Sequence, residues 1–243
     1  MFGFFDLHKF IPSPDNKKKL ALIINIDTAT ESASVCLSMD SEILGFFNND
    51  QQKEHASFLH HSIQTVLHDC NKSLIDVDAF AVTSGPGSYT GLRVSMATAK
   101  GFCYTLSKPL IMVNTLKVMC LAANKYAVDE LIDCLFCPMI DARRMEVFTA
   151  VYNSKLESVV DPHALIVTDN FCLDLLKKKR ILFFGNGSEK FKKIATHINI
   201  FFANVEFNAN DLSKLAYVSY LQRDFADTTY SQPQYFKPFH SNT

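Results

Sequence analysis

The sequence predicts an α/β fold of two lobes, each of which opens with a strand meander and continues with helices. Two observations support this prediction: short apolar runs alternate with segments of helical periodicity, and the same pattern starts twice along the chain. Residues 23–27 read Ile-Ile-Asn-Ile-Asp and residues 137–141 read Cys-Pro-Met-Ile-Asp. Each is a buried strand that ends in aspartate and is followed by a polar turn and a return strand. The sequence therefore predicts an internal duplication that places Asp27 and Asp141 at equivalent positions.

The first half of the chain contains a three-strand meander and two long amphipathic helices. In the first helix Leu59, Ile63 and Val66 recur on one face, and Pro109 follows the second helix, which it cannot continue. The predicted strands are Leu20–Ile26, Ala33–Met39, Glu42–Phe47, 78–83 and 110–113, and the predicted helices are 54–70, 91–107 and 115–126.

The second half repeats the start and then becomes less regular. The predicted strands are Leu135–Ile140, Met145–Tyr152 and 181–184, and the predicted helices are 169–178, 187–196 and 210–223. We expect an N-terminal extension at 1–19, a first lobe at 20–112 and a second lobe at 113–243. The C-terminal helix either stays in the second lobe or packs back on the first.

The composition limits the classes of protein to which the chain can belong. With 243 residues and 48% hydrophobic content the chain can bury a full core. A net charge of −1 excludes a strong basic field, so we expect no strong autonomous nucleic-acid binding, although an acidic patch facing a basic partner remains open. Seven cysteines without framework spacing indicate reduced thiols in the cytoplasm. No targeting segment and no apolar run of about 20 residues is present, so no membrane association is expected.

The pair Cys134-x-x-Cys137 has two interpretations. As a functional motif it is half of a zinc site or a redox pair, but no second pair follows it. Within the apolar stretch that contains it, cysteine behaves as a small apolar residue. We expect a buried strand here and not a metal or redox site.

Glycine is concentrated in one segment. The chain has eight glycines, and four of them, at 85, 87, 91 and 101, fall within 17 residues. Gly85 and Gly87 lie where a strand must turn sharply into a helix, and Ser88 or Thr90 can cap that helix. Exposed amides at the helix start would form an anion site, and the alternative is a strand–turn–helix junction without a ligand.

Four segments together resemble the TsaB (YeaZ) family. Ser-Gly-Pro-Gly-Ser-Tyr-Thr-Gly-Leu-Arg-Val at 84–94 is similar to the signature of that family, and Asp-Thr-Ala-Thr at 27–30 is similar to its first turn. Met-Ile-Asp-Ala-Arg-Arg-Met-Glu-Val-Phe at 139–148 and Pro-Gln-Tyr-Phe-Lys at 233–237 match two further stretches. The matches run in family order from about residue 21 to 238.

This resemblance implies a two-lobed actin-like (ASKHA) fold and a role in N6-threonylcarbamoylation of adenosine 37 in tRNA. It implies a heterodimer with the catalytic paralogue TsaD, beside the ATPase TsaE, with tRNA met indirectly through the complex; whether tRNA contacts this chain is left open. A homodimer of the isolated chain is a further option. The resemblance also implies that TsaD carries the metal and performs the transfer, so that this chain is a non-catalytic subunit. The competing hypothesis is an autonomous actin-like ATPase or phosphotransferase.

The phosphate hairpins of actin-like ATPases are altered here, which predicts a degraded nucleotide site. Ala29 stands where such hairpins usually carry glycine, Glu31 adds a repelling charge, and the turn at 141–144 contains no glycine. We expect no cofactor of its own, with ATP or ADP held weakly or at the partner interface. The residues of this degraded anion or nucleotide site are Asp27, Thr28, Thr30, Gly85, Gly87, Ser88, Arg93, Asp141 and Arg143.

We predict no metal site and no catalytic residue. The catalytic paralogue carries a His-x-x-x-His helix motif where this chain has Val113–Met119, and that stretch contains no histidine. The histidines of the 54–70 helix are not three or four residues apart, so no pair can share one ion. They are His55, His60, His61 and His68.

The two long helices of the first lobe are the expected partner surface. Small residues, among them Gly91, Ser95 and Thr98, recur at helical spacing on the second helix, whose opposite face suits the core. The helices either pack only on each other and the sheet or form the dimer face, as in the family. We predict that Ser95→Arg or Thr98→Arg abolishes partner binding and leaves the monomer folded. The predicted interface is His55, Phe58, Ser62, Thr65, Gly91, Ser95, Thr98 and Phe102.

Overall fold

The computed structural model describes residues 20–49, 55–124 and 133–237, with the side chains of residues 55 and 56 left out. The chain divides into two compact units. Among the described residues, the N-terminal unit holds residues 20–118 together with 207–234, and the C-terminal unit holds 119–206 together with 235–237. The predicted extension at 1–19 lies outside the described residues.

The N-terminal unit is built on a five-stranded mixed sheet in the order β3-β2-β1-β4-β5. β1, β2 and β3 form the expected antiparallel meander, while β4 and β5 run parallel to β1. β1 and β4 are buried along their whole length, which explains why they are mostly apolar; their polar residues Asn25, Asp27 and Thr83 are buried as well. The strands are β1 (Leu22–Asp27), β2 (Ala33–Met39), β3 (Glu42–Asn49), β4 (Ala79–Thr83) and β5 (Leu110–Val113).

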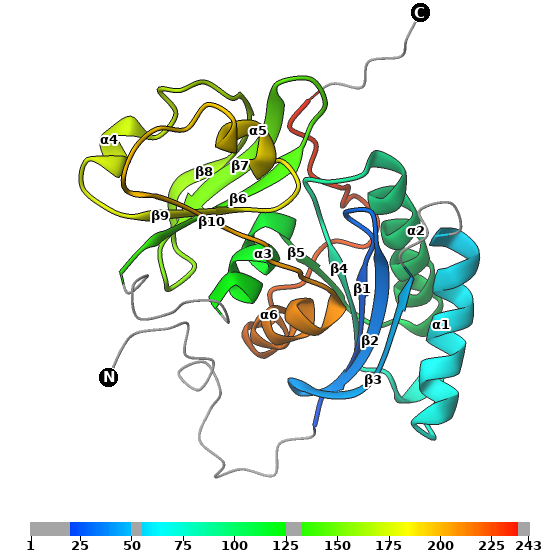
Figure 1. The fold of residues 1–243 in the computed structure, drawn as a ribbon. Helices are drawn as coiled ribbons and strands as arrows, with labels where there is room; N and C mark the ends of the chain where they lie inside the picture. The colour runs from blue at the N-terminus through cyan, green and yellow to red at the C-terminus, as the bar shows by residue number, and fades with distance from the viewer. Residues whose placement is uncertain (1–19, 50–54, 125–132, 238–243) are drawn as a thin grey trace, which may run out of the picture. The chain divides into compact units, whose positions relative to one another are not determined.

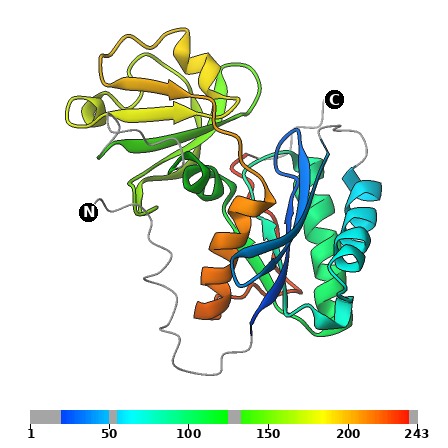
Figure 2. The same ribbon diagram turned by 60° about the horizontal axis from the view of Figure 1, so that its bottom comes forward.

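Helices cover both faces of this sheet (Figure 1). α1 (His55–Asp69) and α2 (Tyr89–Leu106) pack on one face, and α6 (Ala209–Gln222) packs on the other, as the rotated view in Figure 2 shows. Leu59 of α1 and Met96 of α2 join alternate β1 residues such as Ile24 in one core. A short 3-10 helix (Leu74–Asp76) precedes β4. Within the described part of the chain, no helix combines the length and apolarity needed to cross a membrane.

The C-terminal unit has a second five-stranded sheet in the order β10-β9-β6-β7-β8. Phe171, Phe183, Phe191 and Phe202 form an aromatic cluster against one face of it. Its elements are β6 (Leu135–Asp141), β7 (Glu146–Tyr152), β8 (Ser158–Ile166), β9 (Ile181–Phe184), β10 (Ile200–Ala203), α4 (Leu173–Leu176) and α5 (Ser188–Lys192), and α3 (Thr115–Ala123) spans the boundary between the units.

The internal duplication is confirmed. Each sheet begins with a three-strand antiparallel meander and is extended by two further strands that run parallel to the first strand of the meander and lie beside it in order. The strands β6–β10 therefore correspond in order to β1–β5. Asp27 is the last residue of β1 and Asp141 is the last residue of β6, so the two aspartates occupy equivalent positions as expected.

The second half departs from the prediction in several elements. β8 and β10 were not expected, because β8 is a half-exposed edge strand that carries Asp161 and Pro162, and β10 has only four residues. The helices expected at 169–178 and 187–196 shrink to α4 and α5. The boundary between the units falls after Val118, six residues beyond the expected one, and α6 belongs to the N-terminal unit.

Candidate functional site

Asp27 is buried at the carboxyl end of β1 and is 1% exposed. Its Oδ1 accepts hydrogen bonds from the Thr83 hydroxyl at 2.7 Å and from the Ala29 amide at 3.1 Å. Among the described residues none donates a hydrogen bond to Oδ2. Burial raises the pKa of Asp27 to about 6, and the charge of Asp211 adds to that rise, although the two hydrogen bonds oppose it.

The glycine loop after β4 is pressed against the turn that follows β1. A Cβ atom at Gly87 would collide with the carbonyl oxygen of Ala29, and one at Gly91 would collide with that of Thr28. Gly85 has a φ of 106°, and a Cβ atom there would lie 2.7 Å from the carbonyl oxygen of Gln234. These glycines are therefore required for close backbone packing within the unit.

The polar groups of this loop are also used within the unit. The Ser88 amide donates to the Ala29 carbonyl at 2.7 Å, and the Ser88 hydroxyl accepts from the Gly91 amide at 3.3 Å, which caps α2. The Thr28 hydroxyl donates to the Gly91 carbonyl at 2.8 Å. These residues thus form a close-packed strand–turn–helix junction between β4 and α2, and the anion site stays a prediction.

Five residues of the predicted nucleotide site come together here in the N-terminal unit, namely Asp27, Thr28, Gly85, Gly87 and Ser88. Thr30 is half-buried in the turn after β1. Arg93 is exposed on α2 with its guanidinium 4.1 Å from the centre of the Tyr89 ring. The two remaining residues, Asp141 and Arg143, lie in the C-terminal unit. Nucleotide binding by this set stays a prediction.

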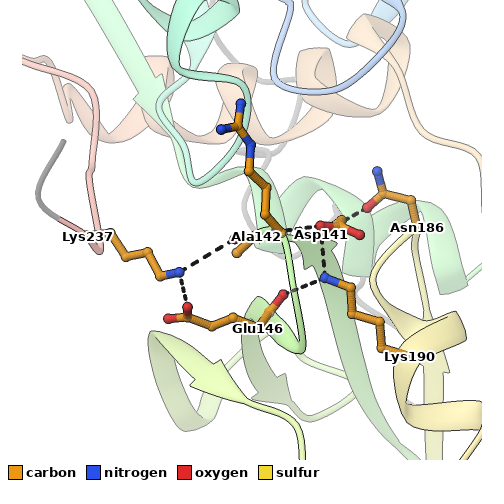
Figure 3. A network of polar contacts seen from close by, with 7 residues as sticks. Asp141, Ala142, Glu146, Asn186, Lys190 and Lys237 are labelled. Atoms are coloured by element: carbon orange, nitrogen blue, oxygen red, sulfur yellow. Dashed lines mark hydrogen bonds and ion pairs between the residues drawn. The ribbon is translucent and has the colours of Figure 1, made fainter. Parts of the chain in front are cut away.

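The equivalent hairpin of the C-terminal unit, between β6 and β7, is clamped by lysines (Figure 3). Asp141 Oδ1 accepts from Lys190 Nζ at 2.9 Å and from the Arg143 amide at 2.6 Å, and the Asp141 amide donates to Asn186 Oδ1 at 2.8 Å. Partial burial raises the pKa of Asp141, but the hydrogen bonds and the charge of Lys190 outweigh it and hold the pKa below its ordinary value.

A second clamp comes from the tail of the chain. Lys237 pairs with the Glu146 carboxylate and donates to the Ala142 carbonyl at 3.5 Å (Figure 3). Phe236 packs on Phe148 with ring centres 6.3 Å apart. Lys190 also donates to the Glu146 carbonyl at 2.8 Å. The last two residues of the terminal Pro-x-Tyr-Phe-Lys motif therefore hold this hairpin in place, a role that was not predicted.

The loop after β9 repeats the packing of the glycine loop. Gly185 has a φ of 89°, and a Cβ atom at Gly187 would lie 2.9 Å from the Ile140 carbonyl carbon and 3.0 Å from the Asp141 amide. The Gly-Asn-Gly sequence at 185–187 is the sequence signal for this equivalence with the glycine loop.

The predicted partner surface requires a correction. Gly91, Ser95 and Ser62 are buried in the N-terminal unit, and the Ser95 hydroxyl donates to the carbonyls of Gly91 and Leu92 at 3.3 and 3.2 Å. The prediction that Ser95→Arg leaves the monomer folded is wrong, because the arginine would have to enter the core.

The other predicted interface residues are half-buried or not described. Phe102 stacks on Phe80 with ring centres 5.2 Å apart, and it packs against the core together with Phe58. Thr65 and Thr98 are half-buried. The side chain of His55 lies outside the described residues. The expected core face of α2 is confirmed for Leu92, Met96 and Cys103.

A different stripe of α2 is exposed. Ala97, Gly101 and Tyr104 lie along it, with Tyr104 85% exposed, and a Cβ atom at Gly101 would have no atom within 4 Å. We call these three residues the α2 stripe. The neighbouring α1, which packs against α2, exposes His61, Gln64 and His68.

The cysteines are free thiols, as expected. Cys134 and Cys137 are buried at the start of β6 and within it, and burial raises the pKa of both thiols, to about 11 at Cys134. The expected buried strand at this pair is confirmed. In the part of the chain that the structure describes, no group of three or more His, Cys, Asp or Glu residues is placed to hold a metal ion.

Comparison with known proteins identifies the family. The family model described as TsaD, tRNA N6-adenosine threonylcarbamoyltransferase, matches residues 33–235. A Bacillus subtilis protein named tRNA threonylcarbamoyladenosine biosynthesis protein TsaB is 31% identical over 177 residues, which cover 71% of this chain and 74% of that protein. The chain belongs to the TsaB family. A Haemophilus influenzae TsaB is 28% identical over 225 residues, covering 88% of this chain and 93% of the relative.

A solved structure of the family supports the fold. YeaZ from Pseudomonas aeruginosa superposes with a TM-score of 0.74 at 21% identity, covering 88% of this chain and 99% of that one. The duplicated α/β architecture described above is therefore the actin-like fold that the TsaB resemblance implies. The signature stretch of the TsaB family at 84–94 forms the glycine loop and the start of α2, and the stretch at 139–148 forms the clamped hairpin.

Proposed function

We propose that this chain is a non-catalytic subunit of tRNA threonylcarbamoyladenosine biosynthesis that dimerises with a TsaD paralogue through α1 and α2. The observation that carries the proposal is membership of the TsaB family, which places the chain in this biosynthesis. In this role the chain would contact TsaD, the partner that transfers the threonylcarbamoyl group. TsaE and nucleotide would bind to the complex of the two proteins, and the reaction would take place in the cytoplasm.

The environment of the potential catalytic groups favours a non-catalytic role. The Asp27 carboxylate is buried and engaged by Thr83 and Ala29, which leaves it poorly placed to hold a cation outside the unit. The thiols of Cys103 and Cys137 are buried with raised pKa values, so neither is an activated nucleophile. The segment that would carry the metal-binding histidines of TsaD has none.

The α2 stripe is suited to close helix packing. A glycine inside a helix costs about 1 kcal/mol relative to alanine, and Gly101 gains nothing within the unit because no atom lies near its Cβ position. Small side chains at Ala97 and Gly101 let the ridges of a second helix approach α2, and Tyr104 offers a large exposed ring beside them. A partner helix would supply the missing contacts.

The partner surface is tested with arginine substitutions on two faces of the N-terminal unit. Gly101→Arg is expected to lower the affinity for TsaD by at least about 100-fold, because the side chain fills the space that the partner needs. Gln222→Arg on α6, on the opposite face of the sheet, is the matched control and should bind normally. Circular dichroism and thermal unfolding should show both variants folded. Normal TsaD affinity in a folded Gly101→Arg variant would rule out the α2 stripe.

The role itself is tested by reconstitution with threonine, bicarbonate, ATP, tRNA and the other components, with and without this chain. Product that forms only in its presence supports the proposal. Equal product without it, together with ATP turnover by the isolated chain that Asp27→Ala abolishes, would instead favour an autonomous actin-like ATPase.

A further inference from the structure

The tip of the β6–β7 hairpin carries two adjacent arginines in an unusual backbone conformation. Arg143 and Arg144 have φ values of 68° and 49°, and both side chains are exposed. This left-handed region favours glycine and asparagine, which are the common residues of tight hairpin turns. Among the described residues, neither guanidinium has a hydrogen-bond or ion-pair partner. The chain thus places two long cationic side chains where a smaller residue would fit the backbone better, and such outliers are concentrated at functional sites.

The stem of the hairpin is electrically balanced, and the tip is not. Lys190 pairs with Asp141, and Lys237 pairs with Glu146, so the charges of these four residues cancel (Figure 3). The two arginines remain as the net positive charge of the hairpin. Because the stem is held at both sides, the tip presents its arginines from a fixed base, which lowers the entropy cost of binding.

The hydrogen bonding of the hairpin indicates how a ligand would be held. The Ala142 amide donates to the Glu146 carbonyl, the Glu146 amide donates to the Arg143 carbonyl, and the Arg143 amide is taken by Asp141. These amides cannot cradle a phosphate as a glycine-rich hairpin does. The charged donors that the tip offers a ligand are the guanidinium groups, which bind phosphate oxygens in bidentate fashion.

We propose that Arg143 and Arg144 contact the phosphodiester backbone of the RNA substrate. This inference rests on the proposed function, which makes tRNA the substrate of the complex. The adjoining Met145 is 45% exposed and offers an apolar surface to a sugar or base beside the phosphates. With a net charge of −1 the chain cannot bind RNA strongly alone, so this contact adds to those of the partner.

The test replaces the turn with residues that suit its backbone. The double variant Arg143→Asn/Arg144→Gly should keep or raise the melting temperature, because both new residues adopt positive φ readily. In the reconstituted complex the KM for tRNA should rise about tenfold or more with kcat little changed. In a direct binding assay the slope of log affinity against log salt should fall by about one to two, as for one or two lost phosphate contacts.

The matched control removes two exposed lysines of the same unit, Lys178→Gln/Lys193→Gln, and should leave the KM and the salt slope unchanged. A folded arginine variant with normal tRNA affinity and KM overturns the inference. The inference is also overturned if the arginine variant binds tRNA normally but no longer binds TsaD or TsaE, because the arginines would then contact an acidic protein surface. Normal tRNA affinity with loss of ATP binding would overturn it too, because the arginines would then contact a nucleotide.

Failure of the proposed function is distinguishable from these outcomes. It would appear as product formation without the wild-type chain, whereas failure of the arginine contact leaves the chain necessary and the tRNA affinity unchanged.

Discussion

At the scale of residues, the duplication puts two equivalent aspartates in opposite environments. Asp27 is enclosed by β1, β4 and α6 and faces Asp211, so its pKa is raised to about 6. Asp141 reaches solvent and pairs with Lys190, so its pKa is lowered. The same backbone position therefore shifts the titration of the aspartate to higher pH in one unit and to lower pH in the other.

The pH dependence of stability should reveal the burial of Asp27. A folded-state pKa above the ordinary 3.8 means that the folded protein holds this proton more tightly than the unfolded chain. Its contribution is therefore largest below pH 4 and is lost as the pH rises through about 6, a change of the order of 3 kcal/mol. Asp27→Asn removes this titration, so urea unfolding should show the variant more stable than the wild type at pH 7.5 and less dependent on pH.

Asp141→Asn provides the control of opposite sign. Because the pKa of Asp141 is lowered, its carboxylate stabilises the fold above the unfolded-state pKa, and that contribution is lost as the pH falls through the folded-state value. The substitution should therefore lower stability at pH 7.5. Coinciding pH profiles for Asp27→Asn and the wild type would show that burial does not control the pKa of Asp27.

At the scale of elements, α2 contains two sets of small residues that serve different purposes. Gly91, Ser95 and Ala99 face the sheet and the turn after β1, whereas Ala97 and Gly101 face outward. The first set lets the helix lie against the backbone of its own unit. The second set leaves an outer surface of small residues that no described part of the unit covers.

The same substitution at two glycines of α2 should change stability in opposite directions. Gly91→Ala would place a Cβ atom against the Thr28 carbonyl and should destabilise the fold by about 1–3 kcal/mol, because backbone must shift. Gly101→Ala meets open space and should stabilise it by up to about 1 kcal/mol through helix propensity. Denaturant unfolding of the two variants measures both effects, and equal shifts of the same sign would contradict the assignment of the two faces.

At the scale of the whole molecule, the N-terminal unit is completed by a late segment of the chain. α6 lies about a hundred residues beyond the boundary after Val118, yet it covers one face of the first sheet (Figure 2). The Ala209 amide also donates to the Ser34 hydroxyl at the start of β2. The first unit therefore cannot be complete until the second has been synthesised.

Truncation should expose this dependence. A chain ending at residue 206 loses the buried Leu212 and Leu215, which together contribute about 3–6 kcal/mol, a large part of the stability of a typical domain. We expect it to lack a cooperative thermal transition for the first sheet and to bind hydrophobic dyes. A chain ending at Lys237 keeps α6 and the clamped hairpin and should unfold like the full chain. Normal cooperative unfolding of the shorter chain would show that α6 is dispensable.

Much of the fold and part of the site could be predicted from the amino-acid order. Buried strands that end in aspartate show the duplication directly, because a strand buried on both faces is a nearly continuous apolar run. The Ser-Gly-Pro-Gly-Ser segment predicts the junction before α2, since few residues tolerate its turns. The half-exposed β8 and the four-residue β10 give no comparable signal, because neither has a long apolar run.

The amino-acid order is enough to predict the family, the repeated meander and the positions of the two aspartates. Which small residues of α2 face outward depends on the packing of the folded unit, because helical periodicity defines the faces of a helix without saying which one the sheet covers. Tertiary packing also determines that Gly87 and Gly91 accommodate neighbouring carbonyls and that Lys190 and Lys237 clamp the hairpin of Arg143. These contacts join residues that are far apart in the chain, and a local sequence pattern does not indicate which distant residues come into contact.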